Sequence, residues 1–255
     1  MANEIISRFS VIILLTEYVE LSGRTTINFE NVVGGLCRGW QNDSPIDFCL
    51  ATIVESVRKC YVLSALLWVS GWLRTPKKSL LDIKFIAHPV NLNGNLWGII
   101  IVRLSYIESA EMMKVHVYMY EPLIDDEYHG EMETVWEGMQ QKDDDAERQG
   151  KEGLRGFVER WHQASIPKSK LVINSIEWVE APEQPDSASC CVLVVAQAHH
   201  YLTGNTERHS YSVSKNDLNV MCLRMFWRIL HHSKERALTS RTPSNIDQKL
   251  KDELE

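Results

Sequence analysis

The chain has 255 residues, 44% of them hydrophobic, and a formal net charge of −7. This composition predicts one domain over 1–235 with a substantial core, a charged insertion at about 124–153 and a polar tail over 236–255. The net negative charge argues against a general nucleic-acid-binding protein. The apolar run over 9–15 is short and acidic residues follow it at once, so we expect no signal peptide, no membrane span and no membrane partner.

The six cysteines show no CxxC pair and no spacing typical of metal sites. Together with the many Lys and Glu residues, they favour a reducing intracellular compartment, nucleus or cytoplasm, over a disulfide framework. We therefore expect neither a metal nor another cofactor.

The N-terminal part of the chain contains one well-marked helix. Asp43 or Ser44 can cap it, Pro45 suits its first position, and apolar residues then recur at helical spacing, which predicts a helix over 44–58. The patterns around it predict an apolar segment of ambiguous type over 5–20, a short helix over 28–37 closed by glycines, and a buried apolar segment over 61–73.

Strand patterns dominate the middle of the chain. A Gly-Asn turn at 94–95 separates two of them, and a third alternates Val115, Val117 and Met119 with other residues, as a half-buried strand does. The strands are expected over 83–87, 96–104, 114–120 and 171–179.

Between and after these strands, the remaining patterns are helical or strongly charged. The run over 142–153 most simply forms a solvated, partly disordered loop. Helices are expected over 132–139, 156–165, 190–202 and 216–232, with a frayed tail from 239 onward.

A polar loop leads into the helix over 190–202. Asp186, Ser187 and Ser189 can each cap that helix, which places Cys190 in its first turn. Free helix amides favour a thiolate there and should lower the pKa of Cys190. Gln184 could return a side-chain amide toward the sulfur and bind a developing oxyanion. An ordinary buried cysteine pair at a helix start explains this stretch equally well.

Four blocks in order resemble the ubiquitin-like-protein-specific cysteine proteases, the desumoylating and deneddylating enzymes of the adenovirus-protease clan. Trp40-x-Asn42-Asp43-x-x-Ile46 is similar to the family's Trp-Leu-Asn-Asp-x-x-Ile block. The next two blocks, Pro89-Val90-Asn91 with Leu96-Trp97-Gly98 and Tyr118-Met-Tyr120-Glu121-Pro122-Leu123, resemble its second and third. Gln184-x-Asp186-x-x-Ser189-Cys190 resembles the Gln-to-Cys block with its spacing kept.

The resemblance implies a papain-like α+β fold, in which a central helix carrying the cysteine packs on a mixed sheet with flanking helices. It makes Cys190 the nucleophile position and Gln184 the oxyanion donor. Trp40, Trp97 and Asp43 become substrate-binding positions, with the two tryptophans walling a narrow tunnel for a modifier's Gly-Gly tail. The implied partner is a ubiquitin-like modifier of the SUMO or NEDD8 type, or its conjugates.

Three positions depart from the family pattern. Leu96 occupies the position of the catalytic His, Glu121 that of the Asp, and Cys191 that of the Gly after the nucleophile. Leucine can neither take the thiol proton nor protonate the leaving amine, so we expect lost or much reduced catalysis. His88, His116 and His129 are local candidates for a displaced base, although an ordinary structural or surface role explains each more simply.

Three functions therefore stay open. The preferred reading is a protease-fold protein that still binds a modifier tail without efficient hydrolysis. An active cysteine isopeptidase that uses Cys190 with a substituted base is the second. A non-catalytic interaction protein that keeps only the fold is the third.

Overall fold

The computed structural model describes residues 15–20, 23–28, 43–94, 96–139, 150–180, 182–186, 189–204 and 212–225, with only the backbone described before residue 45. Its centre is a five-stranded mixed sheet in the order β3-β4-β5-β6-β9. The strands are β3 Cys60–Val62, β4 Phe85–Leu92, β5 Leu96–Ile107, β6 Met112–Tyr120 and β9 Lys170–Trp178. The three middle strands are antiparallel, while β3 and β9 join the two sides in parallel.

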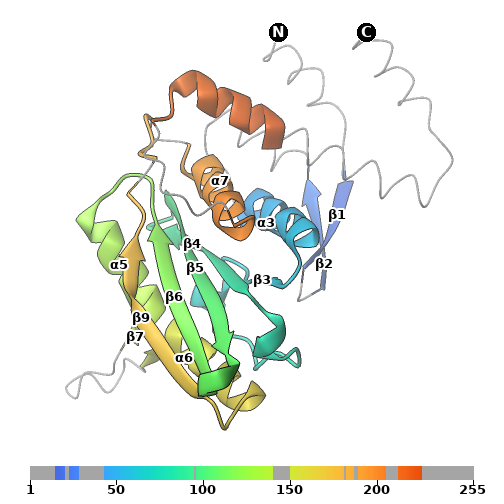
Figure 1. Ribbon diagram of the computed structural model, residues 1–255. Helices are drawn as coiled ribbons and strands as arrows, with labels where there is room; N and C mark the ends of the chain where they lie inside the picture. Colours follow the sequence, from blue (N-terminus) through green and yellow to red (C-terminus); the bar gives the residue numbers. More distant parts are fainter. Residues whose placement is uncertain are drawn as a thin grey trace, which may run out of the picture.

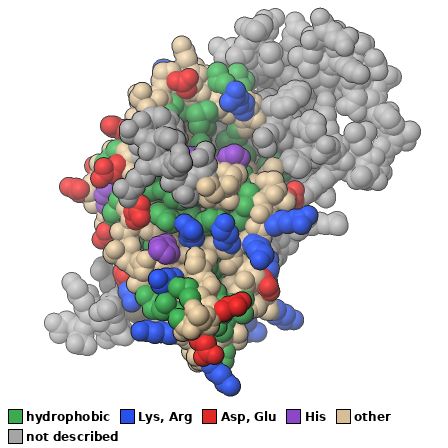
Figure 2. Space-filling model, in the orientation of Figure 1, with side chains coloured by type: hydrophobic (Ala, Val, Ile, Leu, Met, Phe, Trp, Pro, Cys, Tyr) green, Lys and Arg blue, Asp and Glu red, His purple; other side chains and the backbone are tan. Residues whose placement is uncertain are grey.

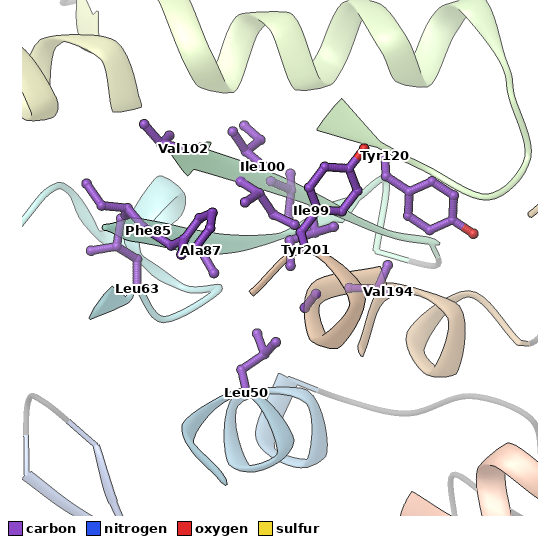
Figure 3. Packing of buried hydrophobic residues seen from close by; sticks show 14 of the residues in the cluster. Leu50, Leu63, Phe85, Ala87, Ile99, Ile100, Val102, Tyr120, Val194 and Tyr201 are labelled. Atoms are coloured by element: carbon purple, nitrogen blue, oxygen red, sulfur yellow. The ribbon is translucent and has the colours of Figure 1, made fainter. Parts of the chain in front are cut away.

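Helices cover both faces of this sheet (Figures 1 and 3). On one face, α7 (Cys190–Leu202) packs on β5, and α3 (Asp43–Val57) packs on α7. On the other face, α5 (Asp126–Glu137) lies against β4 and β5, and α6 (Leu154–Ser165) packs beside it. A further helix over 215–225 has no label in Figure 1.

The smaller elements lie around this sandwich. They are α4 Leu67–Ser70 and the two-stranded pairs β1 Leu15–Glu20 with β2 Gly23–Asn28 and β7 Gly138–Met139 with β8 Lys151–Glu152. Short 3-10 turns span Leu80–Asp82 and Glu108–Ala110. Within the described ranges, no helix has the length and apolar content that a membrane crossing requires.

Side chains of β5 point alternately to the two faces of the sheet and contribute to the core on both. In Figure 3, Ile100 and Val102 point toward α5 and α6, while Leu50 of α3 and Val194 of α7 lie on the other side of the sheet. Both sets are fully buried, because a central strand covered on two faces has no solvent-facing side. The architecture confirms the predicted α+β fold with a mixed sheet and flanking helices.

Several predicted boundaries differ from those observed. The strand expected over 83–87 continues to Leu92 and includes Pro89. β3 pairs only with 85–87, so the missing N–H of Pro89 leaves no ladder bond unmade on that side. The helix expected over 132–139 begins earlier, at Asp126, where Asp125 caps it by accepting from Glu127 N at 2.9 Å.

Other predictions fall wholly or partly outside the described residues. These are the N-terminal segment up to residue 14, the helix over 28–37, Trp40, the charged run over 142–149, the end of the helix over 216–232, and the tail.

Candidate active site

Asp186 shapes the loop that leads into α7. Its Oδ1 accepts the backbone N–H of Ser189 at 2.9 Å, and its Oδ2 accepts the Ser189 hydroxyl at 2.8 Å. Ser189 occupies the N-cap position, but its hydroxyl is turned back to Asp186 and accepts no helix N–H. The helix then begins at Cys190, as the sequence predicts.

The Cys190 thiol is buried, with a relative exposure of 4%. Burial raises its pKa above the ordinary value, and the nearby Asp186 carboxylate adds to that rise. The backbone N–H groups of Trp97, Cys191 and Cys190 itself approach the sulfur and lower the pKa in part. The expected net lowering is therefore wrong, because desolvation of the thiolate outweighs the helix amides. Cys191 is buried as well, and its thiol pKa is also raised by burial.

Two groups at the end of β6 hold the loop that carries Gln184. The Tyr120 hydroxyl donates to the Pro182 carbonyl at 2.6 Å, and the Gln184 backbone N–H donates to the Pro122 carbonyl at 2.8 Å. Gln184 is buried at 7% exposure, and its side-chain Oε1 has no hydrogen-bond partner in the described part of the chain. The end of β6 thus fixes the segment that precedes Cys190.

Glu121 follows Tyr120 and is almost fully buried. Its Oε2 accepts the backbone N–H of Leu123 at 2.9 Å, and its Oε1 accepts that of Asp125 at 2.6 Å. The same Oε1 lies 3.3 Å from Nε2 of His129, in the first half of α5. The carboxylate therefore stabilises the turn between β6 and α5 and forms an acid–imidazole pair with His129.

The His129 ring lies on the α5 side of the sheet. It stacks on Trp178 with ring centroids 3.8 Å apart and planes inclined by 21°. Trp178 is paired with Met119 across β6 and β9, at alternate positions to Tyr118, whose ring contacts Tyr201 of α7. Cys190 belongs to α7, so the sheet edge lies between the imidazole and the thiol.

Leu96 and Trp97 begin β5, and both are buried. The Trp97 backbone N–H approaches the Cys190 sulfur. Leu96, at the position that the resemblance gives to a catalytic His, is therefore the chain neighbour of a residue beside the thiol. That residue is an apolar leucine, which offers no proton acceptor. Asp43 begins α3, but its side chain, like Trp40, lies outside the described residues.

The other histidine candidates lie elsewhere. His88 of β4 is fully buried and contacts Trp72, with ring centroids 5.2 Å apart, and burial lowers its pKa to about 3. Its ladder partner Ile100 points toward α5, away from α7. His116 is half-buried on β6 and its Nδ1 lies 3.0 Å from Asn174 Nδ2. Among the described groups that shift the pKa of Cys190, none is a histidine.

Sequence reasoning placed Cys190 at a helix start and named Asp186 among its possible caps, but it did not predict the contacts that hold this region together. Tyr120 and Pro122 anchor the Gln184 loop, and Asp186 organises the helix start through Ser189. The sequence signal for these contacts was the mixed polar and aromatic end of the strand over 114–120. Such a pattern does not identify a hydrogen-bond partner about sixty residues away, as Pro182 is for Tyr120.

No family model matches the chain, and no curated protein matches it in sequence. Solved structures do resemble it. The yeast Ulp1 protease domain in complex with Smt3, the yeast ortholog of SUMO, superposes with a TM-score of 0.56 at 13% identity, over 91% of this chain and 94% of that one. The SUMO protease Ulp1 with its catalytic cysteine oxidised to a sulfenic acid gives 0.55 at 13% identity, over 90% and 91%. The chain therefore has the fold of Ulp1-type SUMO proteases.

Proposed function

We propose that this chain is a ubiquitin-like-protein protease-like domain whose hydrolysis is lost or much reduced, and that it binds the C-terminal Gly-Gly tail of a ubiquitin-like modifier. The partner class is suggested by Ulp1, which was solved in complex with a SUMO ortholog. Trp97 and Gln184, with Trp40 and Asp43 by resemblance, are the proposed tail-binding residues.

The observation that carries the loss of catalysis is Leu96 beside Trp97. In a Cys-His pair, the imidazole takes the thiol proton during attack and returns it to the leaving amine. Leucine supplies neither transfer. The raised pKa of Cys190 acts in the same direction, since less of the sulfur is present as thiolate at neutral pH.

A second candidate is an active isopeptidase with a substituted base, and the Glu121–His129 pair is the observation that favours it. A carboxylate bonded to an imidazole is the arrangement that orients a general base. Its placement beside α5 weighs against it, because a base must come within hydrogen-bond reach of the sulfur. Movement of the turn after β6 would be needed to bring His129 to Cys190.

The deciding experiment is labelling by ubiquitin-like-modifier probes that carry a C-terminal electrophile. The unaltered chain, Cys190→Ser and Leu96→His are compared with each probe. If the unaltered chain is not labelled and Leu96→His is, the result supports a tail site that is intact beside a cysteine that lacks its base. Labelling of the unaltered chain that His129→Phe abolishes would refute the disarmed site and establish the second candidate.

Tail binding is tested separately from chemistry. A titration of the Cys190→Ser protein with SUMO-type and NEDD8-type modifiers, each with and without its Gly-Gly end, should show affinity only for the intact tails. Trp97→Ala should weaken that affinity. If no modifier or tail peptide binds, the tail-binding proposal fails, and the fold alone would remain for a non-catalytic interaction protein.

A further inference from the structure

Part of the sheet face beside α7 is not covered by any helix that the structure describes. Tyr118 of β6 contacts Tyr201 in the last turn of α7, with ring centroids 4.8 Å apart. Side chains alternate along a strand, so His116 and Lys114 lie on the same face as Tyr118, beyond the end of the helix. In Figure 1 the lower parts of β6 and β9 lie in front of the molecule, and no labelled helix crosses them.

This uncovered area is basic. Arg103 of β5 is directly paired with His116, and Lys170 of β9 is paired with Met112, two residues from Lys114. Alternation places the four residues on one surface, which we call the open basic face: Arg103, Lys114, His116 and Lys170. Lys, Arg and His side chains gather across the middle of this side of the molecule in Figure 2.

Among the residues that the structure describes, no acidic side chain forms an ion pair with the open basic face. In the described part of the chain no ion pair includes Arg103, Lys114 or Lys170, whereas Arg155 and Arg160 each pair with glutamates. The Nε of Arg103 is buried and has no hydrogen-bond partner there. Arg103 as a whole is only half-buried, so an acceptor from outside the chain would pair with the rest of the guanidinium and not with the enclosed Nε.

His116 also presents a hydrogen-bond donor on this face. The Asn174 side-chain amide donates to Nδ1 at 3.0 Å, which leaves the proton on Nε2 as a donor. Lys114 and His116 are two residues apart on one strand, which separates them by about 6.8 Å. Carboxylates at alternate positions of an extended chain have the same separation, so two of them can meet these two donors together.

Acidic residues limit the length of this surface. Glu108 and Glu111 lie at the exposed turn between β5 and β6, and Glu177 of β9 is paired with Tyr118 at the other end. A long polyanion such as a nucleic acid would run over these carboxylates, and the net charge of −7 would also repel it. A short acidic segment avoids both.

We propose that the open basic face binds a short, extended acidic segment of a partner protein, in which one carboxylate meets the Arg103–His116 pair and the next alternate carboxylate meets Lys114. Cys190 lies at the opposite end of α7, whose 13 residues span about 18 Å along the axis. The surface is thus separate from the candidate active site, and it does not depend on tail binding or on catalysis.

The test measures binding of a short fluorescein-labelled peptide with glutamate at alternate positions, by fluorescence anisotropy at low salt. The same peptide with glutamine at those positions is the control ligand. We expect the glutamate peptide to bind, and affinity to fall with added salt and by about tenfold in Arg103→Gln, the loss typical of a charge-assisted hydrogen bond. Lys114→Gln should weaken binding too, whereas Lys77→Gln, which removes an exposed charge from a distant loop, should not.

Each protein is first checked for an unchanged thermal unfolding transition, and Lys114→Gln alone decides if Arg103→Gln unfolds. Absence of binding, equal binding of the glutamine peptide, or an equal loss in Lys77→Gln would overturn the proposal. Displacement of the peptide by a single-stranded oligonucleotide that binds more tightly through the same residues would also overturn it, in favour of nucleic-acid binding.

Discussion

Acidification should destabilise the fold through His88. Its side chain is fully buried on β4, and neither ring nitrogen has a hydrogen-bond partner in the described part of the chain. Burial lowers its pKa from 6.5 to about 3, and the Leu63 backbone raises it only in part. The folded protein therefore keeps a neutral imidazole at pH values where the unfolded chain has bound a proton.

The magnitude follows from linkage. Below pH 6.5 the unfolded state binds one more proton at this site than the folded state, so stability falls as pH falls, until the folded pKa near 3 is reached. Each pH unit within this window lowers the free energy of unfolding by about 1.4 kcal/mol. From pH 6.5 to pH 4.5 the loss from His88 alone is about 2 kcal/mol.

Urea unfolding followed by far-UV circular dichroism between pH 7 and pH 4.5 measures this loss. Carboxylates also titrate in the acid range, so the contribution of His88 is the difference between the unaltered chain and His88→Leu or His88→Gln. Both variants should lose less stability than the unaltered chain over the same range, whatever their stability at pH 7. Parallel curves for all three proteins would refute the reasoning and show that the imidazole is protonated inside the fold.

Three further outcomes are expected. Gly153→Ala should lower the free energy of unfolding by about 2 kcal/mol or more, because its Cβ would meet the backbone nitrogen of Gly138. Gly130→Ala, whose Cβ would lie in open space on α5, should instead stabilise the fold slightly, and thermal unfolding of both variants measures the difference. Tyr120→Phe should cost about 1–3 kcal/mol in urea unfolding, because it removes a buried hydrogen bond to the loop before α7; an unchanged midpoint would contradict that role. Alkylation of Cys190 by iodoacetamide should be slow at pH 7 and rise only well above the pH at which an exposed thiol reacts, and a fast reaction at pH 7 would show an activated thiolate.

Local pattern was sufficient for most of the fold. Alternation in β6 and helical spacing in α3 and α7 appear within single segments, so the strands and helices around Cys190 could be placed from the sequence. The short strand β3 could not be predicted, because its three residues form ladder hydrogen bonds only with β4. The early start of α5 was missed because its first turns are charged, and Met132 and Trp136 become buried only on the sheet.

The position of Cys190 at the start of α7 was predictable from the sequence, but the electrostatic environment of its thiol was not. Motif spacing located Cys190, but the sign of its pKa shift depends on burial by segments distant in the chain. The pairing of Glu121 with His129 could not be predicted from the sequence either. It depends on the turn after β6, whose backbone N–H groups bind the carboxylate and whose geometry no sequence pattern indicates. Both misses arise from tertiary contacts that outweigh a local preference.

The hydrogen bonds that Glu121 already accepts lead to a final prediction about the Leu96→His variant. A carboxylate has about four acceptor positions. Leu123 N, Asp125 N and His129 Nε2 use three of them, so Glu121 has little capacity left to orient a second imidazole. We therefore expect Leu96→His with His129→Phe, which keeps an aromatic ring on Trp178, to be labelled by electrophilic modifier probes faster than Leu96→His alone. Slower labelling of the double variant would mean that His129 assists the reaction, because its removal would then withdraw a proton acceptor and not a competitor.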